Sequence, residues 1–330
     1  MPDDLAPSSP TLAPELEPLQ AWLCEKYDSP SLRLVDATLL PGGAVQRNWR
    51  LDLADGRWTD SVVLRAGPNI PLAESSAKAE EFAILRRAHA HGVPVCKPLW
   101  LETGRDVIGS PFFVSEYRTG MTERERLFAG APLPELVGEL AATLARLHAV
   151  PPPEGTAPES PAMRVVMLAG WEHATPNVPD GVRVGLAWLR DNAPEPIRDA
   201  LVHRDFRTGN FLVGAGRLAA ILDWEFAGAG DPVEDIGWFC ARCWRGPNAA
   251  LEAGGLGTRD AFFDAYIAAG GPVPDPVRVL FWEVFAHVRW ALIALQQGAR
   301  ARAGEWPREE LVEAEARVPG LAADIAELVR

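Results

Sequence analysis

The feature that most constrains the fold is a pair of apolar runs in the second half of the chain. The two runs lie close together, and each borders a polar turn. In LVHRDFRTGNFLV, an apolar pair leads into a polar loop and the run FLV leads out of it. In AAILDWEF, a second apolar run ends at Asp223. Short apolar runs bounded by polar turns are typical of strands, and a rigid hairpin can present the polar groups of its loop. We therefore expect Asp205, Asn210 and Asp223 to converge.

These three side chains suit the transfer of a phosphoryl group to an alcohol. The reaction needs a carboxylate to orient or deprotonate the hydroxyl, and hard oxygen ligands to hold magnesium on nucleotide phosphates. Asp205 is the candidate base, because the amide of Asn210 can bind a metal but cannot act as a base near neutral pH. Asp223 is the candidate anionic metal ligand. Such residues are also common in tight turns, but H-x-D-x4-N followed thirteen residues later by an aspartate that ends an apolar run favours the catalytic interpretation.

The residue pattern changes from strand-like to helical along the chain, which predicts two halves of different structure. The runs LRLVDATLL, WRLDLADGRW and SVVLRAG predict a small antiparallel sheet, which two later runs near VCKPLWLE and SPFFVSEY extend. Between them, helical spacing predicts a buried stripe of Ala79, Phe82, Ala83, Leu85 and Ala88. From LPELVGELAATLARLHAV onward the periodicity is mainly helical. We predict an α+β fold with a sheet-containing lobe at 1–117, including an N-terminal tail and helix, and a helical lobe at 118–330.

Composition and charge restrict the partners and the compartment. Lys and Arg number 32 and Asp and Glu number 45, and the net charge of −13 argues against a broad basic surface for nucleic acid. The first residues lack the pattern of a secretory signal and four cysteines are too few for a disulfide framework, so we expect a cytoplasmic protein. The apolar stretch 279–295 carries Glu283, His287 and Arg289, which predicts a buried helix with no membrane partner.

Two further features have both a structural and a functional interpretation. Cys240 and Cys243 form a CxxC pair, for which packing is favoured over zinc or redox chemistry because no second pair exists. A group of aromatic and basic residues could cradle a partly apolar acceptor or only pack the core, and packing is favoured. This group consists of Trp244, Arg245, Trp282, Arg289 and Trp290.

The segment from His203 to Asp235 resembles the catalytic and metal-binding loops of the aminoglycoside phosphotransferase and choline kinase families, which have a bilobal protein-kinase-like fold. HRD and the asparagine five residues later are also similar to eukaryotic protein kinases, but LDWE replaces DFG and GDPVEDIGW replaces an activation segment with APE. HRDFRTGN, LDWEFAG and GDPVEDIGW most resemble the phosphotransferase-like domains found alone in many bacteria and fused to some acyl-CoA dehydrogenases. The resemblance implies Asp205 as catalytic base, Asn210 and Asp223 as Mg²⁺ ligands, His203 as a structural support of the loop and Asp235 as its buried anchor.

The same resemblance implies a nucleotide site in the first lobe. The turn that covers the phosphates would contain Gly42 and Gly43, whose lack of a side chain permits close approach of the backbone. Arg65 stands on the third strand where the family usually has lysine; it keeps the charge but presents a bulkier fork. Glu81 is spaced like the acidic partner on the following helix, with Glu80 as the alternative if the register differs by one. The backbone around Glu116 and Tyr117 would meet the adenine.

We therefore predict an ATP- or GTP-dependent, Mg²⁺-dependent phosphotransferase that acts on a hydroxyl group of a small molecule. Two classes of acceptor are consistent with the sequence, an aminoglycoside-like compound and a hydroxyacyl-CoA. A catalytically silent nucleotide-binding module is the alternative from another class, with Arg65 as its only support. A protein kinase is disfavoured by the missing APE-type segment.

Overall fold

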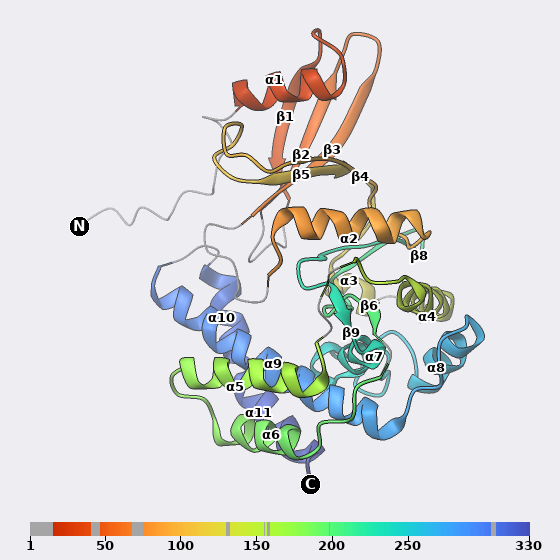
Figure 1. Cartoon of the computed structure of the whole chain (residues 1–330), viewed down its shortest axis with the longest axis vertical. Coiled ribbons are helices and arrows are strands. Elements are labelled where there is room, and N and C mark those ends of the chain that lie inside the picture. The colour runs from red at the N-terminus through yellow and green to blue at the C-terminus, as the bar shows by residue number, and fades with distance from the viewer. Residues whose placement is uncertain are drawn as a thin grey trace. The chain divides into compact units, whose positions relative to one another are not determined.

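The computed structural model describes the chain except for residues 1–15, 41–46, 68–74, 130–132, 155, 157–158, 198 and 305–307. The structure divides into two units (Figure 1). The first contains the chain up to Arg86 together with Cys96–Arg118, and the second contains Arg87–Val95 together with Thr119–Arg330. Residues 87–95 thus group with the second unit, although they precede the boundary predicted at residue 117.

The first unit is built on a five-stranded antiparallel sheet with the order β1-β2-β3-β5-β4. Each strand follows a run that the sequence predicts, because apolar and polar residues alternate on its two faces. The strands are β1 (Arg33–Leu39), β2 (Arg47–Ala54), β3 (Thr59–Ala66), β4 (Pro98–Glu102) and β5 (Phe112–Glu116). In this register Arg65 of β3 lies opposite Asn48 of β2 and Phe113 of β5.

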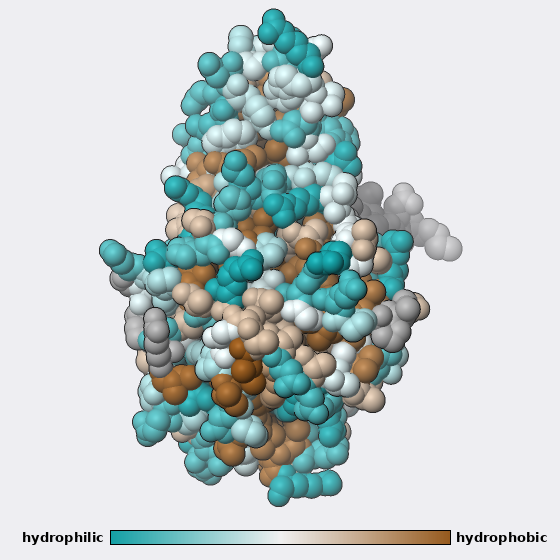
Figure 2. Space-filling model, turned by 90° about the vertical axis from the view of Figure 1, so that its right-hand side faces the viewer, coloured by the Kyte–Doolittle hydropathy of each residue, from teal (hydrophilic) through white to brown (hydrophobic). Residues whose placement is uncertain are grey.

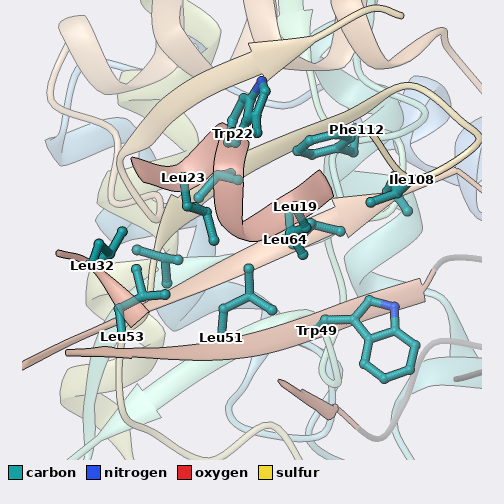
Figure 3. Close-up of a cluster of buried hydrophobic side chains, with 13 residues drawn as sticks. Leu19, Trp22, Leu23, Leu32, Trp49, Leu51, Leu53, Leu64, Ile108 and Phe112 are labelled. Atoms are coloured by element: carbon teal, nitrogen blue, oxygen red, sulfur yellow. The ribbon is translucent and has the colours of Figure 1, made fainter. Parts of the chain in front are cut away.

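Helix α1 (Leu16–Lys26) covers one face of this sheet. Figure 3 shows Trp22 and the leucines of α1 facing the apolar side chains of the strands, with Leu51 and Leu64 among them. The Trp22 ring meets Phe112 edge-on at 5.0 Å, and its indole N–H donates to a carboxylate oxygen of Glu102. The core of the unit therefore lies between α1 and the sheet.

Helix α2 (Lys78–Ala90) corrects the apolar stripe predicted for it. Three of the five predicted residues are buried, but Ala79 and Ala83 are exposed. The buried face instead includes Lys78 and Glu81, which form an ion pair. A pattern of apolar residues misses this face because it assigns every charged residue to the solvent side.

The second unit is mainly helical and holds two short sheets, each of two antiparallel strands. Its strands pair as β6 (Ala200–Val202) with β9 (Gly228–Gly230), and β7 (Phe211–Gly214) with β8 (Arg217–Ile221). Its α-helices are α3 (Arg124–Ala129), α4 (Pro134–Ala149), α5 (Pro161–Ala174), α6 (Asp180–Asp191), α7 (Pro232–Cys240), α8 (Arg259–Ala268), α9 (Pro276–Arg302), α10 (Arg308–Ala316) and α11 (Val318–Leu328). With the sheet of the first unit, these elements confirm the predicted α+β class.

Helix α9 is the central element of the second unit. It contacts α5, α6, α7, α10 and α11. Within the described residues it is the one helix long and apolar enough to cross a membrane, but 83% of its most apolar window is buried inside the protein. The prediction of a buried helix at 279–295 is therefore confirmed.

The face of the molecule in Figure 2 is largely hydrophilic, with apolar residues in small groups.

The contact between α7 and α9 depends on Gly237. A Cβ at this position would lie 2.4 Å from the Cβ of Trp282 and 2.8 Å from the backbone carbonyl carbon of that residue. Such distances are far below van der Waals contact, so a larger residue would push the two helices apart. Gly138, in the middle of α4, is different, because a Cβ added there would have no neighbouring atom within 4 Å.

We expect Gly237→Ala to lower the free energy of unfolding by about 1–3 kcal/mol, as overpacking of a core does. Gly138→Ala is the matched control and should leave stability unchanged or raise it by up to about 1 kcal/mol, because alanine favours the helix. Chemical denaturation of both variants measures the difference. Equal stability of the two variants would contradict the close packing of α7 on α9.

Candidate active site

The loop between β6 and β7 carries Asp205 at the point where several donors converge on its carboxylate. One oxygen, Oδ1, accepts from the indole N–H of Trp238 at 3.0 Å and from Nε of Arg207 at 2.9 Å. The other oxygen, Oδ2, accepts from the side-chain amide of Asn210 at 2.6 Å. Only 5% of Asp205 is exposed. These bonds hold the carboxylate in one orientation, as a group that must meet a substrate hydroxyl requires.

Asn210 and Asp223 are linked through the backbone of Leu222. The Nδ2 of Asn210 also donates to the backbone carbonyl of Asp205 at 2.9 Å, so its amide is turned with nitrogen toward the loop. The backbone carbonyl of Asn210 accepts from the N–H of Leu222 at 2.8 Å. Asp223 follows directly, with a φ of +66°. The structure therefore brings the two predicted metal ligands to neighbouring backbone positions, as the sequence predicts.

His203 supports the loop as a neutral imidazole. The N–H of Asp205 donates to its Nδ1 at 3.2 Å, so the proton lies on Nε2, which donates to the carbonyl of Leu222 at 3.0 Å. The ring is fully buried and meets Trp224 edge-on at 4.7 Å. Burial lowers the pKa of His203 below its ordinary value, although nearby aspartates oppose the shift. This side chain links the loop that carries Asp205 to Leu222, the residue that precedes Asp223.

Asp235, on α7, anchors the same loop. Its two oxygens accept from successive backbone N–H groups, Oδ2 from His203 at 2.8 Å and Oδ1 from Arg204 at 2.6 Å. His148 of α4 lies 3.2 Å from Oδ2, and its other ring nitrogen lies 2.8 Å from the hydroxyl of Tyr266. Burial alone would raise the pKa of Asp235, but the bonds from His148 and the loop lower it below the ordinary value.

The loop backbone is strained where Asp235 holds it. Arg204 has a φ of +64°, a left-handed conformation that non-glycine residues adopt only at a cost. Its carbonyl accepts from Nη1 of Arg289 at 2.6 Å, and that guanidinium stacks on the rings of Phe226 and Trp238 at 4.8 and 4.6 Å. Arg289 is 1% exposed. The predicted aromatic and basic group therefore does pack the core at this point, and it also supports the loop.

A second cluster of charges lies in the first unit. Nε of Arg65 donates to Oε1 of Glu81 at 2.6 Å, and Nζ of Lys78 donates to Oε2 of the same carboxylate at 2.5 Å. Nη1 of Arg65 also reaches the side-chain oxygen of Asn48 at 3.3 Å. Glu81, and not Glu80, faces Arg65; Glu80 accepts from the N–H of Ala77. One buried carboxylate thus holds two cations.

The other residues predicted to contact the nucleotide are two glycines of the covering turn and the backbone at Glu116 and Tyr117. Gly42 and Gly43 lie outside the described residues. The backbone N–H of Glu116 donates to the carbonyl of Lys97 and that of Tyr117 donates to the carbonyl of Ser61, so these two donors are already engaged. Both residues are only partly buried.

The sequence pattern does not predict several residues that take part in these two clusters. Lys78 and His148 lie at ordinary helical positions, and Trp238 lies within an apolar run. Each becomes a partner of a functional side chain only through tertiary packing. Arg207 is different, because it stands two residues after Asp205 inside the predicted loop and could have been singled out there.

The donor chemistry of the loop suits magnesium. Among the described residues no group of three or more His, Cys, Asp and Glu side chains could hold a metal by itself. Magnesium commonly takes one or two protein oxygens and completes its shell with water and phosphate oxygens. Asp223 and the amide oxygen of Asn210 would provide such a pair, since the amide nitrogen is used on Asp205. Cys240 and Cys243 are free, and burial raises the pKa of both thiols, which agrees with a packing role.

Comparison with known proteins identifies the family. The family model described as "Phosphotransferase enzyme family" matches residues 36–282, well over half of the chain. The chain belongs to this family. The resemblance found in the sequence is therefore confirmed by the family match, and similar solved structures share the fold.

Three relatives illustrate what the phosphotransferase resembles. It is 27% identical over 265 residues to mouse (Mus musculus) acyl-CoA dehydrogenase family member 10, covering 73% of the chain and 24% of the relative. The chain spans about a quarter of the length of the curated relatives it matches first. A protein of Ralstonia eutropha JMP134 assigned to the aminoglycoside phosphotransferases has a TM-score of 0.74, 20% identity, and coverage of 95% and 97% of the two chains. A ternary complex of aminoglycoside phosphotransferase APH(4)-Ia with AMP-PNP and hygromycin B has a TM-score of 0.62, 18% identity, and coverage of 92% and 97%.

The buried histidines predict how stability depends on pH. Burial lowers the pKa values of His203 and His287, so between about pH 6.5 and each lowered value the unfolded chain binds more protons than the folded one. The free energy of unfolding should therefore fall as the pH is lowered from 7.5 to 5.5, by at most about 1.4 kcal/mol per pH unit for each histidine. His287→Gln should show a smaller slope in chemical denaturation. The same replacement at the exposed His89 is the control, and equal slopes for the wild type and His287→Gln would contradict the prediction.

Proposed function

We propose that this phosphotransferase moves the terminal phosphoryl group of ATP or GTP to a hydroxyl group of a small molecule, with Mg²⁺ as cofactor and Asp205 as base. The observation that carries the proposal is the orientation of the Asp205 carboxylate by three donors from two elements. A turn aspartate of only structural use would not need its carboxylate held against an amide, an indole and a guanidinium at once. The link between Asn210 and Asp223 supports the same function.

In the proposed reaction, Asp205 accepts the proton of the acceptor hydroxyl as the oxygen bonds to phosphorus. The bond from that phosphorus to the bridging oxygen breaks, and the nucleoside diphosphate leaves with the electron pair. Trp238 and Asn210 keep the carboxylate aimed at the hydroxyl, and Asp235 keeps the loop in its strained conformation. Positioning of this kind supplies much of the catalysis in phosphoryl transfer.

Asp223 and the amide oxygen of Asn210 would hold the Mg²⁺. When bound, the metal ion neutralises charge on the nucleotide phosphates. His203 contributes by fixing the carbonyl of Leu222, so that Asp223 begins from a defined backbone position. A neutral imidazole suits this role, because it adds no positive charge beside the ligands.

The cations on Glu81 would hold the nucleotide phosphates in the first unit. Arg65 takes the strand position at which the family usually has lysine, and Lys78 adds an ammonium from the helix. Glu81 aligns both by sharing its carboxylate. The AMP-PNP complex of the similar APH(4)-Ia structure supports nucleotide use. Because Lys78 places an ammonium on the same carboxylate as Arg65, the arginine at the family's lysine position gives less support to a catalytically silent module.

The acceptor is proposed at the level of its class. The similar APH(4)-Ia structure binds hygromycin B, and the curated relatives are named as acyl-CoA dehydrogenases. An aminoglycoside-like alcohol and a hydroxyacyl-CoA therefore both belong in a first screen. We place the protein in the cytoplasm, where ATP and Mg²⁺ are available.

Asp205→Asn should lower kcat by about 10²–10⁴-fold, because the variant loses the base but keeps an oxygen for Trp238. The assay incubates the protein with nucleotide, Mg²⁺ and a library of hydroxyl compounds, and detects phosphorylated products by mass spectrometry. Asp264→Asn, at an exposed position of α8, is the matched control and should keep wild-type turnover. Thermal unfolding confirms that both variants are folded. Undiminished turnover in folded Asp205→Asn would exclude Asp205 as the base.

Lys78→Met and Arg65→Met should each weaken nucleotide binding by about ten- to a hundredfold, as expected when a charged hydrogen bond to phosphate is lost. Calorimetric titration with AMP-PNP and Mg²⁺ measures the dissociation constant. Arg86→Met, at an exposed position of the same helix as Lys78, controls for the loss of a positive charge. If the two cations only stabilised Glu81, the variants would melt at lower temperature but bind the nucleotide as tightly as the wild type.

A further inference from the structure

A cationic cluster, of which the proposed reaction uses only the bond from Arg207 to Asp205, lies beside the loop within the second unit. It consists of Arg124, Arg207 and Trp244, and we call it the arginine–tryptophan cluster. The guanidinium of Arg207 lies over the Trp244 ring at 4.8 Å, and that of Arg124 lies over the same ring at 5.6 Å. Trp244 is 1% exposed, whereas both arginines are only partly buried. The buried indole packs beneath two guanidinium groups that remain accessible to solvent.

The cluster adjoins the candidate base directly. Arg207 donates from Nε to Asp205, and the Trp244 ring lies 5.2 Å from the ring of Trp238, which donates to the same carboxylate. The backbone of the loop approaches both arginines at Gly209, where an added Cβ would lie 2.9 Å from Nη1 of Arg207 and 3.2 Å from Cδ of Arg124. A group bound by the cluster would therefore lie next to the reacting hydroxyl.

Both arginines have N–H donors for which no described residue provides an acceptor. Arg124 donates to no described residue, and its Nε is buried without a partner. Arg207 uses Nε on Asp205 and Nη1 on the carbonyl of Thr208, and no described residue accepts from its Nη2. A guanidinium presents five N–H donors in a fixed fork that matches a carboxylate or a phosphate. The buried Nε of Arg124 is costly to leave without an acceptor, and a ligand could accept from it.

The charges around Arg124 also favour the binding of an anion. Burial, together with the positive charges of Arg207 and Arg317, lowers the pKa of Arg124 to about 10, and Glu125 offsets only part of this effect. Arg124 forms no ion pair with a described carboxylate. Although the net charge of the chain is −13, Asp205 is the one described carboxylate that pairs with either arginine, and it contacts Arg207. An anion bound between them would relieve the repulsion.

We propose that the arginine–tryptophan cluster binds an anionic group of the acceptor, so that the substrate is an alcohol that also bears a carboxylate or a phosphate. This inference rests on the proposed function for its placement beside Asp205. The cluster would exclude a polycationic acceptor, because such a compound would bring further positive charge against two arginines. Arg207 would then orient the acceptor and the base together.

Binding experiments test the cluster without requiring turnover. The probes are two matched pairs, glycerol 3-phosphate with glycerol, and 4-hydroxybutanoate with its neutral amide, titrated calorimetrically into the full chain. We expect the anionic member of at least one pair to bind the wild type more tightly than its neutral counterpart. Arg124→Gln should weaken that binding by about ten- to a hundredfold. Arg124→Lys should recover part of it, because the charge returns without the fork.

Arg126→Gln is the control variant, since Arg126 is exposed on the same helix and pairs only with Glu123 among the described residues. It should bind the anionic probe as the wild type does. Binding of neither anion, or binding that Arg124→Gln leaves unchanged, would overturn the proposal. A parallel titration with AMP-PNP and Mg²⁺ separates two sources of the anion. If Arg124→Gln weakens AMP-PNP as much as the probe, the cluster serves the nucleotide phosphates and the acceptor proposal is wrong.

Turnover distinguishes this inference from the proposed function. If neutral or cationic alcohols are phosphorylated with higher kcat/KM than anionic ones, and Arg124→Gln does not change this order, the phosphotransferase function stands and the anionic acceptor is excluded. If no alcohol is phosphorylated while Arg124→Gln still abolishes probe binding, the anion site stands and the proposed function fails.

Discussion

The pair of hydrogen bonds that the Asp235 carboxylate accepts from successive backbone N–H groups is the interaction on which the rest of the candidate site depends. It holds His203 and Arg204 at the start of the catalytic loop, where the backbone takes a left-handed turn that it would otherwise avoid. That turn places Asp205 against Trp238 and Asn210. A carboxylate can hold two donors in this way only if it stays ionised while buried, and the donors themselves, with His148, stabilise the charge.

Both clusters of candidate site residues use one buried carboxylate to align several donors. Asp235 aligns backbone N–H groups of the second unit, and Glu81 aligns the side chains of Arg65 and Lys78 in the first. The arrangement is rigid because a buried charge cannot lose a partner without a large penalty. It also explains how an arginine can stand where the family usually has lysine. The ammonium is supplied by the next helix, and the carboxylate serves both cations.

Much of the site could be predicted from the sequence because its key residues are close together along the chain. His203, Asp205 and Asn210 fall within eight residues, so local backbone geometry nearly suffices to bring them together. Asp223 is predictable because the apolar run before it indicates a strand that ends at a fixed point. The stripe predicted for α2 was wrong at Ala79 and Ala83, and it missed Lys78 and Glu81 for the opposite reason. Lys78 and Glu81 face inward only because each finds an opposite charge there, and hydrophobic periodicity contains no information about ion pairing.

The sequence by itself determined the fold class, the order of the elements and the position of the loop that we propose carries the chemistry, because periodicity and turn residues act over short distances. Only the tertiary structure decided the partners of that loop. Trp238 on α7, His148 on α4 and Arg289 on α9 reach it from positions far along the chain, and each has an ordinary helical context in the sequence. The same holds for Arg124, whose Nε lacks an acceptor among the described residues where Trp244 and Gly209 lie against its side chain. Contacts between distant elements are set by packing of the whole core, which no local pattern encodes.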